Sequence, residues 1–284
     1  MSDFKTNYVT SIDGTQIGYR YIGSGPAVML VHGGLQSSLS FTTLATALSA
    51  HFTVYLPDRR GRGLSGPYTA ADPLNAETAD ILALIQHTGA RNIFGLSSGA
   101  IIVLQGALKN CALEKVALYE PPLCIPPASS KKLEIDYERA LQTGNLGKAF
   151  MAIVKGTGDT SFLAKLPGFL IAPFLNSMMK AQKPKDTGLL LRDLIPTFHY
   201  DRLITTHGER LLAEAKELKA QTLFITGSKS KKYLQDTIHA LAFAIPGAQL
   251  LVLEKHGHLA ADNSGAPELV AKHLLQFFGV ESRP

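Results

Sequence analysis

The stretch Gly95-Leu96-Ser97-Ser98-Gly99 decides how this 284-residue chain is expected to fold. It fits the pattern G-x-S-x-G, in which small flanking residues allow a serine to lie on a sharp turn between a strand and a helix with its oxygen exposed. Residues 92–94 before the turn predict a strand, and residues 99–109 after it predict a helix. We therefore interpret Ser97 as a nucleophile. The alternative is a serine that only caps a helix or allows helix and strand to cross closely.

Short apolar runs alternate with helical patterns on both sides of this turn. The runs without polar alternation lie at 27–31, 52–56, 92–94, 115–119, 222–226 and 249–253. Ahead of them, residues 8–12 and 16–22 are joined by Asp13-Gly14, which favours a tight hairpin. Apolar strands separated by helices indicate a parallel sheet covered on both faces. The predicted fold class is α/β, with a doubly wound, mostly parallel sheet.

The alternation stops between residues 121 and 215, where prolines separate mainly helical patterns. We predict a core domain of residues 1–120 and 216–284, with 121–215 as a helical insertion. The insertion carries an apolar set that would suit a hydrophobic part of a substrate, or that forms the insertion's own core. This set is Phe169, Leu170, Ile171, Phe174, Leu175, Met178 and Met179.

Composition excludes several classes of protein. Hydrophobic residues make up 45% of the chain and charged residues 18%, as in a globular enzyme rather than a disordered or fibrous protein. The net charge of +5 is spread over 28 basic and 23 acidic residues without a long block, so no nucleic-acid partner is predicted. No apolar run is long enough for a membrane span and no signal-peptide pattern is present, so a cytoplasmic protein is expected. Cys111 and Cys124 are interpreted as core thiols, without a disulfide framework or a zinc site.

Two glycines follow the apolar run 27–31, in His32-Gly33-Gly34. Glycines at a strand end let backbone N–H groups face a developing oxyanion with no side chain in the way. We therefore predict an oxyanion hole formed by the N–H groups of Gly34 and Ser98. An ordinary turn is the alternative. His32 itself is expected to organise the loop by hydrogen bonding.

Two histidines compete for the role of general base, in the stretch Glu254-Lys255-His256-Gly257-His258. A triad with serine first and histidine last needs its imidazole on the loop after the final strand. Gly257 frees the backbone to turn the ring of His258 inward, whereas His256 follows two charged residues. The sequence therefore favours His258.

These spaced motifs, together with Asp58-Arg59-Arg60-Gly61-Arg62-Gly63-Leu64-Ser65, resemble the α/β-hydrolase superfamily of esterase-like enzymes. The resemblance covers nearly the whole chain except the insertion. It implies an eight-stranded sheet, a helical cap inserted after the sixth strand, and a Ser-His-acid triad that needs no cofactor or metal. It also sets the chain apart from epoxide hydrolases and haloalkane dehalogenases, which have an aspartate at the position of Ser97.

The chain departs from this family at the triad acid. The usual acid lies shortly after the seventh strand, where this chain reads Gly227-Ser228-Lys229-Ser230-Lys231-Lys232. A lysine cannot hold a protonated imidazole. We propose Glu120 instead, because it ends the sixth strand beside the elbow, where some branches of the family carry their acid. Asp236 and Asp201 are the alternatives.

The expected reaction is hydrolysis of a carboxylic ester or lactone through an acyl-enzyme. The partner is then a small molecule with an apolar group. Carbon–carbon bond hydrolysis and a perhydrolase activity resemble the same pattern. A ligand-binding protein with weak catalysis is the alternative outside the enzymes. The natural substrate and the oligomeric state are not readable from the sequence.

Overall fold

The computed structural model describes residues 4–68, 71–109, 112–123, 127–156, 167–182 and 189–279. Cys111 and Cys124 lie outside these residues. The chain divides into two compact units. The first comprises Met1–Leu123 with Tyr200–Pro284, and the second comprises Cys124–His199.

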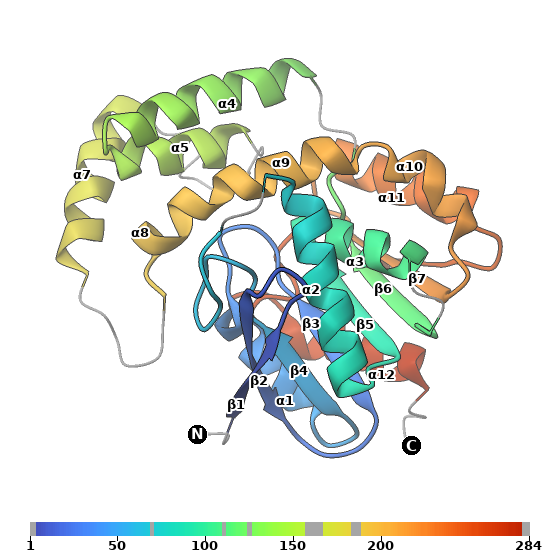
Figure 1. Cartoon of the computed structure of the whole chain (residues 1–284). Helices are drawn as coiled ribbons and strands as arrows, with labels where there is room; N and C mark the ends of the chain where they lie inside the picture. Colours follow the sequence, from blue (N-terminus) through green and yellow to red (C-terminus); the bar gives the residue numbers. More distant parts are fainter. Residues whose placement is uncertain are drawn as a thin grey trace. The chain divides into compact units, whose positions relative to one another are not determined.

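An eight-stranded sheet forms the centre of the first unit in the described part of the chain (Figure 1). Its order is β1-β2-β4-β3-β5-β6-β7-β8; β1 and β2 run antiparallel to their neighbours, and β3 to β8 are parallel. The mostly parallel, doubly wound sheet predicted from the sequence is thus confirmed. The strands are β1 (Lys5–Thr10), β2 (Gln16–Ile22), β3 (Ala27–Val31), β4 (Thr53–Pro57), β5 (Asn92–Leu96), β6 (Lys115–Tyr119), β7 (Gln221–Gly227) and β8 (Gln249–Leu253).

Helices cover both faces of this sheet. Helices α1 and α12 pack on one face, and α2, α3 and α11 pack on the other. The helices of the first unit are α1 (Thr42–Leu48), α2 (Pro73–Thr88), α3 (Ser98–Lys109), α10 (Leu211–Glu214), α11 (Lys232–Ala244) and α12 (Pro267–Phe278). Helix α9 (Phe198–Gly208) begins at the end of the second unit and continues into the first. No helix in the described ranges is long and apolar enough to cross a membrane.

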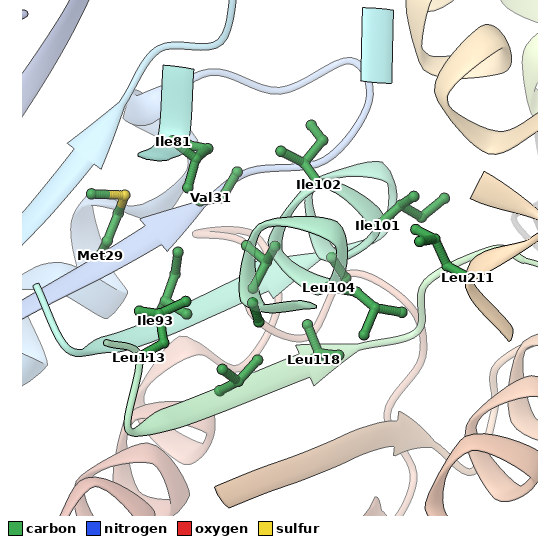
Figure 2. Close-up of a cluster of buried hydrophobic side chains, with 14 of the residues drawn as sticks. Met29, Val31, Ile81, Ile93, Ile101, Ile102, Leu104, Leu113, Leu118 and Leu211 are labelled. Carbon is green, nitrogen blue, oxygen red and sulfur yellow. The ribbon is translucent and has the colours of Figure 1, made fainter. Parts of the chain in front are cut away.

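The central strands are apolar throughout because both of their faces are buried. On β3, Met29 and Val31 belong to the core under α2 and α3, whereas Val28 and Leu30 belong to the core under α1 and α12. Figure 2 shows the first of these cores, with Ile93 of β5 among its members. Full burial of one such side chain contributes about 1.5–3 kcal/mol. This packing makes the ends of β3, β5 and β6 a rigid edge on which a site can be built.

Helices α4 (Pro127–Gln142), α5 (Leu146–Gly156), α7 (Gly168–Ala181) and α8 (Leu191–Leu194) belong to the second unit. Tyr137 is fully buried there, and its hydroxyl donates to the carbonyl of Ile195 at 2.8 Å. The unit ends at His199, whereas the insertion predicted from the sequence runs to residue 215. The difference arises because Ile204 and Leu211 are fully buried in the core of the first unit.

Candidate active site

Ser97 lies at a left-handed turn between β5 and α3. Its φ is +56°, a region that costs a side chain other than glycine roughly 1–3 kcal/mol. Its backbone is held on both sides: the N–H donates to the carbonyl of Tyr119 at 2.9 Å, and its carbonyl accepts from Ala100 and Ile101. The residue is half-buried. This is the strained elbow that the sequence pattern predicts for a nucleophile.

The two glycines of the motif are required by close packing around this turn. A Cβ atom on Gly95 would lie 2.7 Å from the Cα of Ala100, and one on Gly99 would lie 2.4 Å from the carbonyl oxygen of His32. Real Cβ atoms do not approach so closely. The start of α3 can therefore pack against the end of β3 only without side chains at these positions. This contact brings the His32-Gly33-Gly34 loop against the elbow.

Glu120 and His258 are joined by a hydrogen bond at the carboxyl edge of the sheet. The Nδ1 atom of His258 lies 2.6 Å from Oε2 of Glu120. Leu96 of β5 pairs with Tyr119 of β6, so Ser97 and Glu120 follow directly on neighbouring parallel strands. Because the partner is a carboxylate, Nδ1 carries the proton, and Nε2 is left free to accept one.

The carboxylate of Glu120 is fully buried and firmly held. Its Oε1 atom accepts from the hydroxyl of Thr226 at 2.6 Å and from the N–H of Gly227 at 2.8 Å, both at the end of β7. Burial on its own would raise the pKa of Glu120. The hydrogen bond from His258 and the charge on that imidazole instead keep this pKa below its usual value. Glu120 is therefore a fixed anion facing His258.

The backbone of the His32-Gly33-Gly34 loop has a selective pattern of hydrogen bonds. The N–H of Gly33 is already used, because it donates to Oε1 of Gln36 at 2.8 Å. In contrast, the N–H groups of Gly34 and Ser98 donate to no acceptor among the described residues. A Cβ on Gly33 would lie 2.9 Å from the Cβ of Ser97, so the loop lies beside the candidate nucleophile. The two free N–H groups are those predicted for the oxyanion hole.

His32 is a fully buried member of this loop with both ring nitrogens occupied. Its Nδ1 lies 2.9 Å from the carbonyl of Gly33, and its Nε2 accepts from the N–H of Arg59 at 3.2 Å. Burial lowers the pKa of His32 well below its usual value, and the charges of Arg62 and Arg59 lower it further. A neutral ring with no free nitrogen organises the loop, as expected, and has no lone pair for proton transfer.

The chain is similar to known proteins of one family. A family model described as "Alpha/beta hydrolase family" matches residues 28–273. The chain is an α/β hydrolase. An α/β hydrolase from Sphaerobacter thermophilus has a solved structure that covers 96% of this chain and 100% of its own, with 29% identity and a TM-score of 0.75. The family and the enzyme class, hydrolase, follow from these findings.

Two curated relatives match shorter parts of this α/β hydrolase. The uncharacterised hydrolase YraK of Bacillus subtilis is 32% identical over 124 residues, which is 42% of this chain and 45% of the relative. N-formylmaleamate deformylase of Pseudomonas putida is 32% identical over 131 residues, which is 44% of this chain and 49% of the relative. The chain thus matches about half of the length of each.

The sequence did not single out every residue that holds this α/β hydrolase's site. Thr226 and Gly227, which bind Glu120, are ordinary strand-end residues in sequence. The hydroxyl of Tyr119 donates to the carbonyl of Gly257 at 2.6 Å and so fixes the loop that carries His258. Only the positions of these residues in the sequence indicated a role: Tyr119 directly precedes the candidate acid, and Thr226-Gly227 ends the neighbouring strand.

The alternative residues lie in other surroundings. Asp236 is on the exposed part of α11 and pairs with Lys232 at 2.8 Å. Asp201 is buried and binds Arg59 and Arg62. The side chain of His256 makes no hydrogen bond among the described residues. Of the three candidate carboxylates, only Glu120 contacts His258 in the described part of the chain.

Two kinds of interaction are absent from the site in the described residues. Among the described residues the hydroxyl of Ser97 has no hydrogen bond to His258; catalytic hydrogen bonds of this kind often tighten only when substrate binds. In the described residues no group of three His, Cys, Asp or Glu side chains could hold a metal ion.

Glu120→Gln should lower kcat by about a hundredfold or more while the protein stays folded. The amide has nearly the same shape but cannot stabilise a protonated imidazole. Asp236→Asn is the matched control, and because its ion pair is exposed we expect kcat within about twofold of the wild type. Steady-state ester hydrolysis and thermal melting of both variants test this. Full activity in Glu120→Gln would exclude this residue as the acid.

Proposed function

We propose that this α/β hydrolase is a serine hydrolase that cleaves a carboxylic ester or lactone through an acyl-enzyme. In this proposal Ser97 is the nucleophile, His258 the general base and Glu120 the acid. The N–H groups of Gly34 and Ser98 form the oxyanion hole. The observation that carries the proposal is the contact between His258 Nδ1 and the buried carboxylate of Glu120, one strand away from the elbow.

The proposed reaction has two halves. Nε2 of His258 takes the hydroxyl proton of Ser97 as Oγ attacks the substrate carbonyl, and the new oxyanion accepts hydrogen bonds from Gly34 and Ser98. The proton then passes from His258 to the leaving alcohol, and the acyl group remains on Ser97. In the second half, His258 takes a proton from water, which attacks the acyl-enzyme. The carboxylic acid product is released, and His258 returns a proton to Oγ of Ser97.

Glu120 supports both halves by remaining an anion. Each proton transfer to His258 creates an imidazolium next to the Glu120 carboxylate, and the attraction between them lowers the barrier. The donors Thr226 and Gly227 hold the carboxylate in one orientation, so the charge is in place before the reaction. This preorganisation supports a catalytic rather than a purely structural role for the ion pair.

Helix α7 of the second unit carries the apolar set for which a role in binding an apolar group was predicted. On α7, Leu170, Phe174 and Met178 lie one helical turn apart and are 60%, 67% and 39% exposed. Leu175 and Met179 of the same helix are buried and form part of the unit's core. Within the predicted apolar set, two members are thus structural, three are exposed and Ile171 is half-buried; the side chain of Phe169 lies outside the described residues.

The decisive experiment is a substrate panel with active-site labelling. Short p-nitrophenyl esters of increasing acyl length and a lactone should be hydrolysed, and a fluorophosphonate should label Ser97. A vinylogous diketone tests carbon–carbon cleavage, and peracid formation from acetate and hydrogen peroxide tests perhydrolase activity. An N-formyl amide belongs in the panel because of the relative named N-formylmaleamate deformylase. The absence of both turnover and labelling would favour the ligand-binding alternative.

A further inference from the structure

A buried ionic cluster lies behind the His32-Gly33-Gly34 loop. We call it the Asp201 cluster; its members are Asp201, Arg59, Arg62, Glu77 and Ser98. Oδ1 of Asp201 accepts from Arg59 at 2.9 Å and from the hydroxyl of Ser98 at 2.7 Å, and Oδ2 accepts from Arg62 at 2.7 Å. Arg59 also makes a two-pronged ion pair with Glu77. The charged side chains are at most 4% exposed.

The cluster is balanced in charge. Two guanidinium groups face two carboxylates, and the hydroxyls of Ser98 and Tyr68 are neutral partners of these carboxylates. Burial on its own would raise the pKa of Asp201, but the charges of Arg62 and Arg59 and the hydrogen bond from Ser98 keep that pKa below its usual value. Buried ion pairs often contribute no more stability than apolar side chains of the same volume. Their presence at this place therefore points to a role beyond stability.

The cluster contacts both residues that supply the proposed oxyanion hole. The hydroxyl of Ser98 accepts from Arg59 at 2.9 Å and donates to Asp201. On the other side, a Cβ on Gly34 would lie 3.1 Å from Oδ2 of Asp201, so the carboxylate lies directly against this glycine. Arg62 also donates to the carbonyl of Gly33 at 3.4 Å. One carboxylate thus connects the start of α3 with the loop after β3.

We propose that Asp201 is a positioning residue for the oxyanion hole, acting through the side chain of Ser98 and the backbone of Gly34. This inference rests on the proposed function of the same site. Asp201 fixes the relative position of the two N–H donors. Arg59 and Arg62 offset its negative charge, so that a developing oxyanion is not repelled.

Two variants separate the parts of this proposal. Ser98→Ala removes one hydroxyl and leaves all four charges of the cluster in place. Asp201→Asn leaves the size of the side chain unchanged. Its NH₂ group must point either toward Arg59 and Ser98 or toward Arg62, and in both orientations it faces a guanidinium group that can only donate. Because both act on the same amide donors, the double variant should be little worse than Asp201→Asn alone.

Asp80→Asn is the matched control. Asp80 binds the guanidinium of Arg60 at 2.5 Å and the hydroxyl of Ser11, and its side chain is 5% exposed. It therefore resembles Asp201 in burial and in partners. Among the described residues neither Arg60 nor Ser11 forms a hydrogen bond or ion pair with the His32-Gly33-Gly34 loop, so Asp80→Asn should lower the melting temperature without the specific loss of kcat.

The readouts are kcat, KM and the rate ratio between an oxoester and the matching thionoester. Sulfur is a weaker hydrogen-bond acceptor, so this ratio measures how well the oxyanion hole donates. We expect kcat to fall about tenfold in Ser98→Ala and about a hundredfold in Asp201→Asn. The first loss is smaller than the loss caused by removing one whole oxyanion-hole donor, and the second is close to it. KM should stay within about threefold, and the oxoester preference should fall in both variants.

The outcomes are distinguishable from failure of the proposed function. If Ser97→Ala abolishes turnover while Ser98→Ala and Asp201→Asn keep normal kcat and oxoester preference, the positioning role is overturned and the serine mechanism stands. An equal kcat loss in Asp80→Asn would also overturn it. Turnover in Ser97→Ala would instead overturn the proposed function. If Asp201→Asn does not fold, Ser98→Ala decides alone.

Discussion

Replacing Ser97 with alanine should lower ester hydrolysis by about four orders of magnitude or more. The hydroxyl is the proposed nucleophile, and without it no acyl-enzyme can form. Little stability should be lost, because the side chain makes no hydrogen bond among the described residues and the backbone contacts to Tyr119 and Ala100 remain. Steady-state kinetics, fluorophosphonate labelling and a thermal melt of the purified variant measure these effects.

The melt is essential to this experiment. A folded Ser97→Ala protein that cannot be labelled and does not turn over ester agrees with the proposal. A folded variant with near-normal turnover would contradict the whole assignment of the site, whatever the results at other positions.

The second large effect concerns two histidines that are two residues apart. His258→Ala should be about as damaging as the loss of Ser97, because members of a triad act as one unit. His256→Ala should leave most of the activity, since its ring has no hydrogen bond to Glu120 or to any other described residue. Parallel measurement of kcat in the two single variants, and in Ser97→Ala with His258→Ala, checks both statements.

The neighbouring histidine is a strict control for local damage. Both substitutions remove an imidazole from the same loop, so a general disturbance of that loop would affect both variants alike. Equal losses in both would show a general disturbance of the loop, and a larger loss in His256→Ala would show that the base has been assigned to the wrong ring.

The fold was largely predictable from the sequence because strand and helix patterns are local. Continuous apolar runs such as 27–31 and 115–119 marked strands buried on both faces, and G-x-S-x-G marked the elbow between β5 and α3. The end of the insertion was less predictable. Residues 200–215 have the same helical character as the residues before them, and only their burial in the core of the first unit distinguishes them.

The contacts of the site also differ in how far the sequence predicts them. Glu120 was accessible to sequence reasoning because the order of parallel strands places their ends together. The Asp201 cluster was not, because Arg59 and Asp201 are 142 positions apart and each resembles an ordinary surface charge. Three arginines of the stretch 58–65 are buried, whereas charged residues in a loop normally face water. Partners that only the tertiary fold brings together leave no local pattern.

With Glu120 as the proposed acid after β6, the turn after β7 does not have to carry a catalytic carboxylate. That turn is held by its main chain, through the N–H of Ser228 on the carbonyl of Leu253 and the N–H of Lys229 on the carbonyl of His256. Main-chain bonds of this kind do not depend on which side chain the residue carries. The side chains of Lys229 and Lys231 are thus free of the constraint that a catalytic acid would impose there. Charge and shape can therefore be changed at Lys229 and Lys231 without altering the contact between Glu120 and His258, whereas Gly227, whose N–H donates to Glu120, and Ser228, whose hydroxyl accepts from the N–H of Lys255, take part in holding the proposed site.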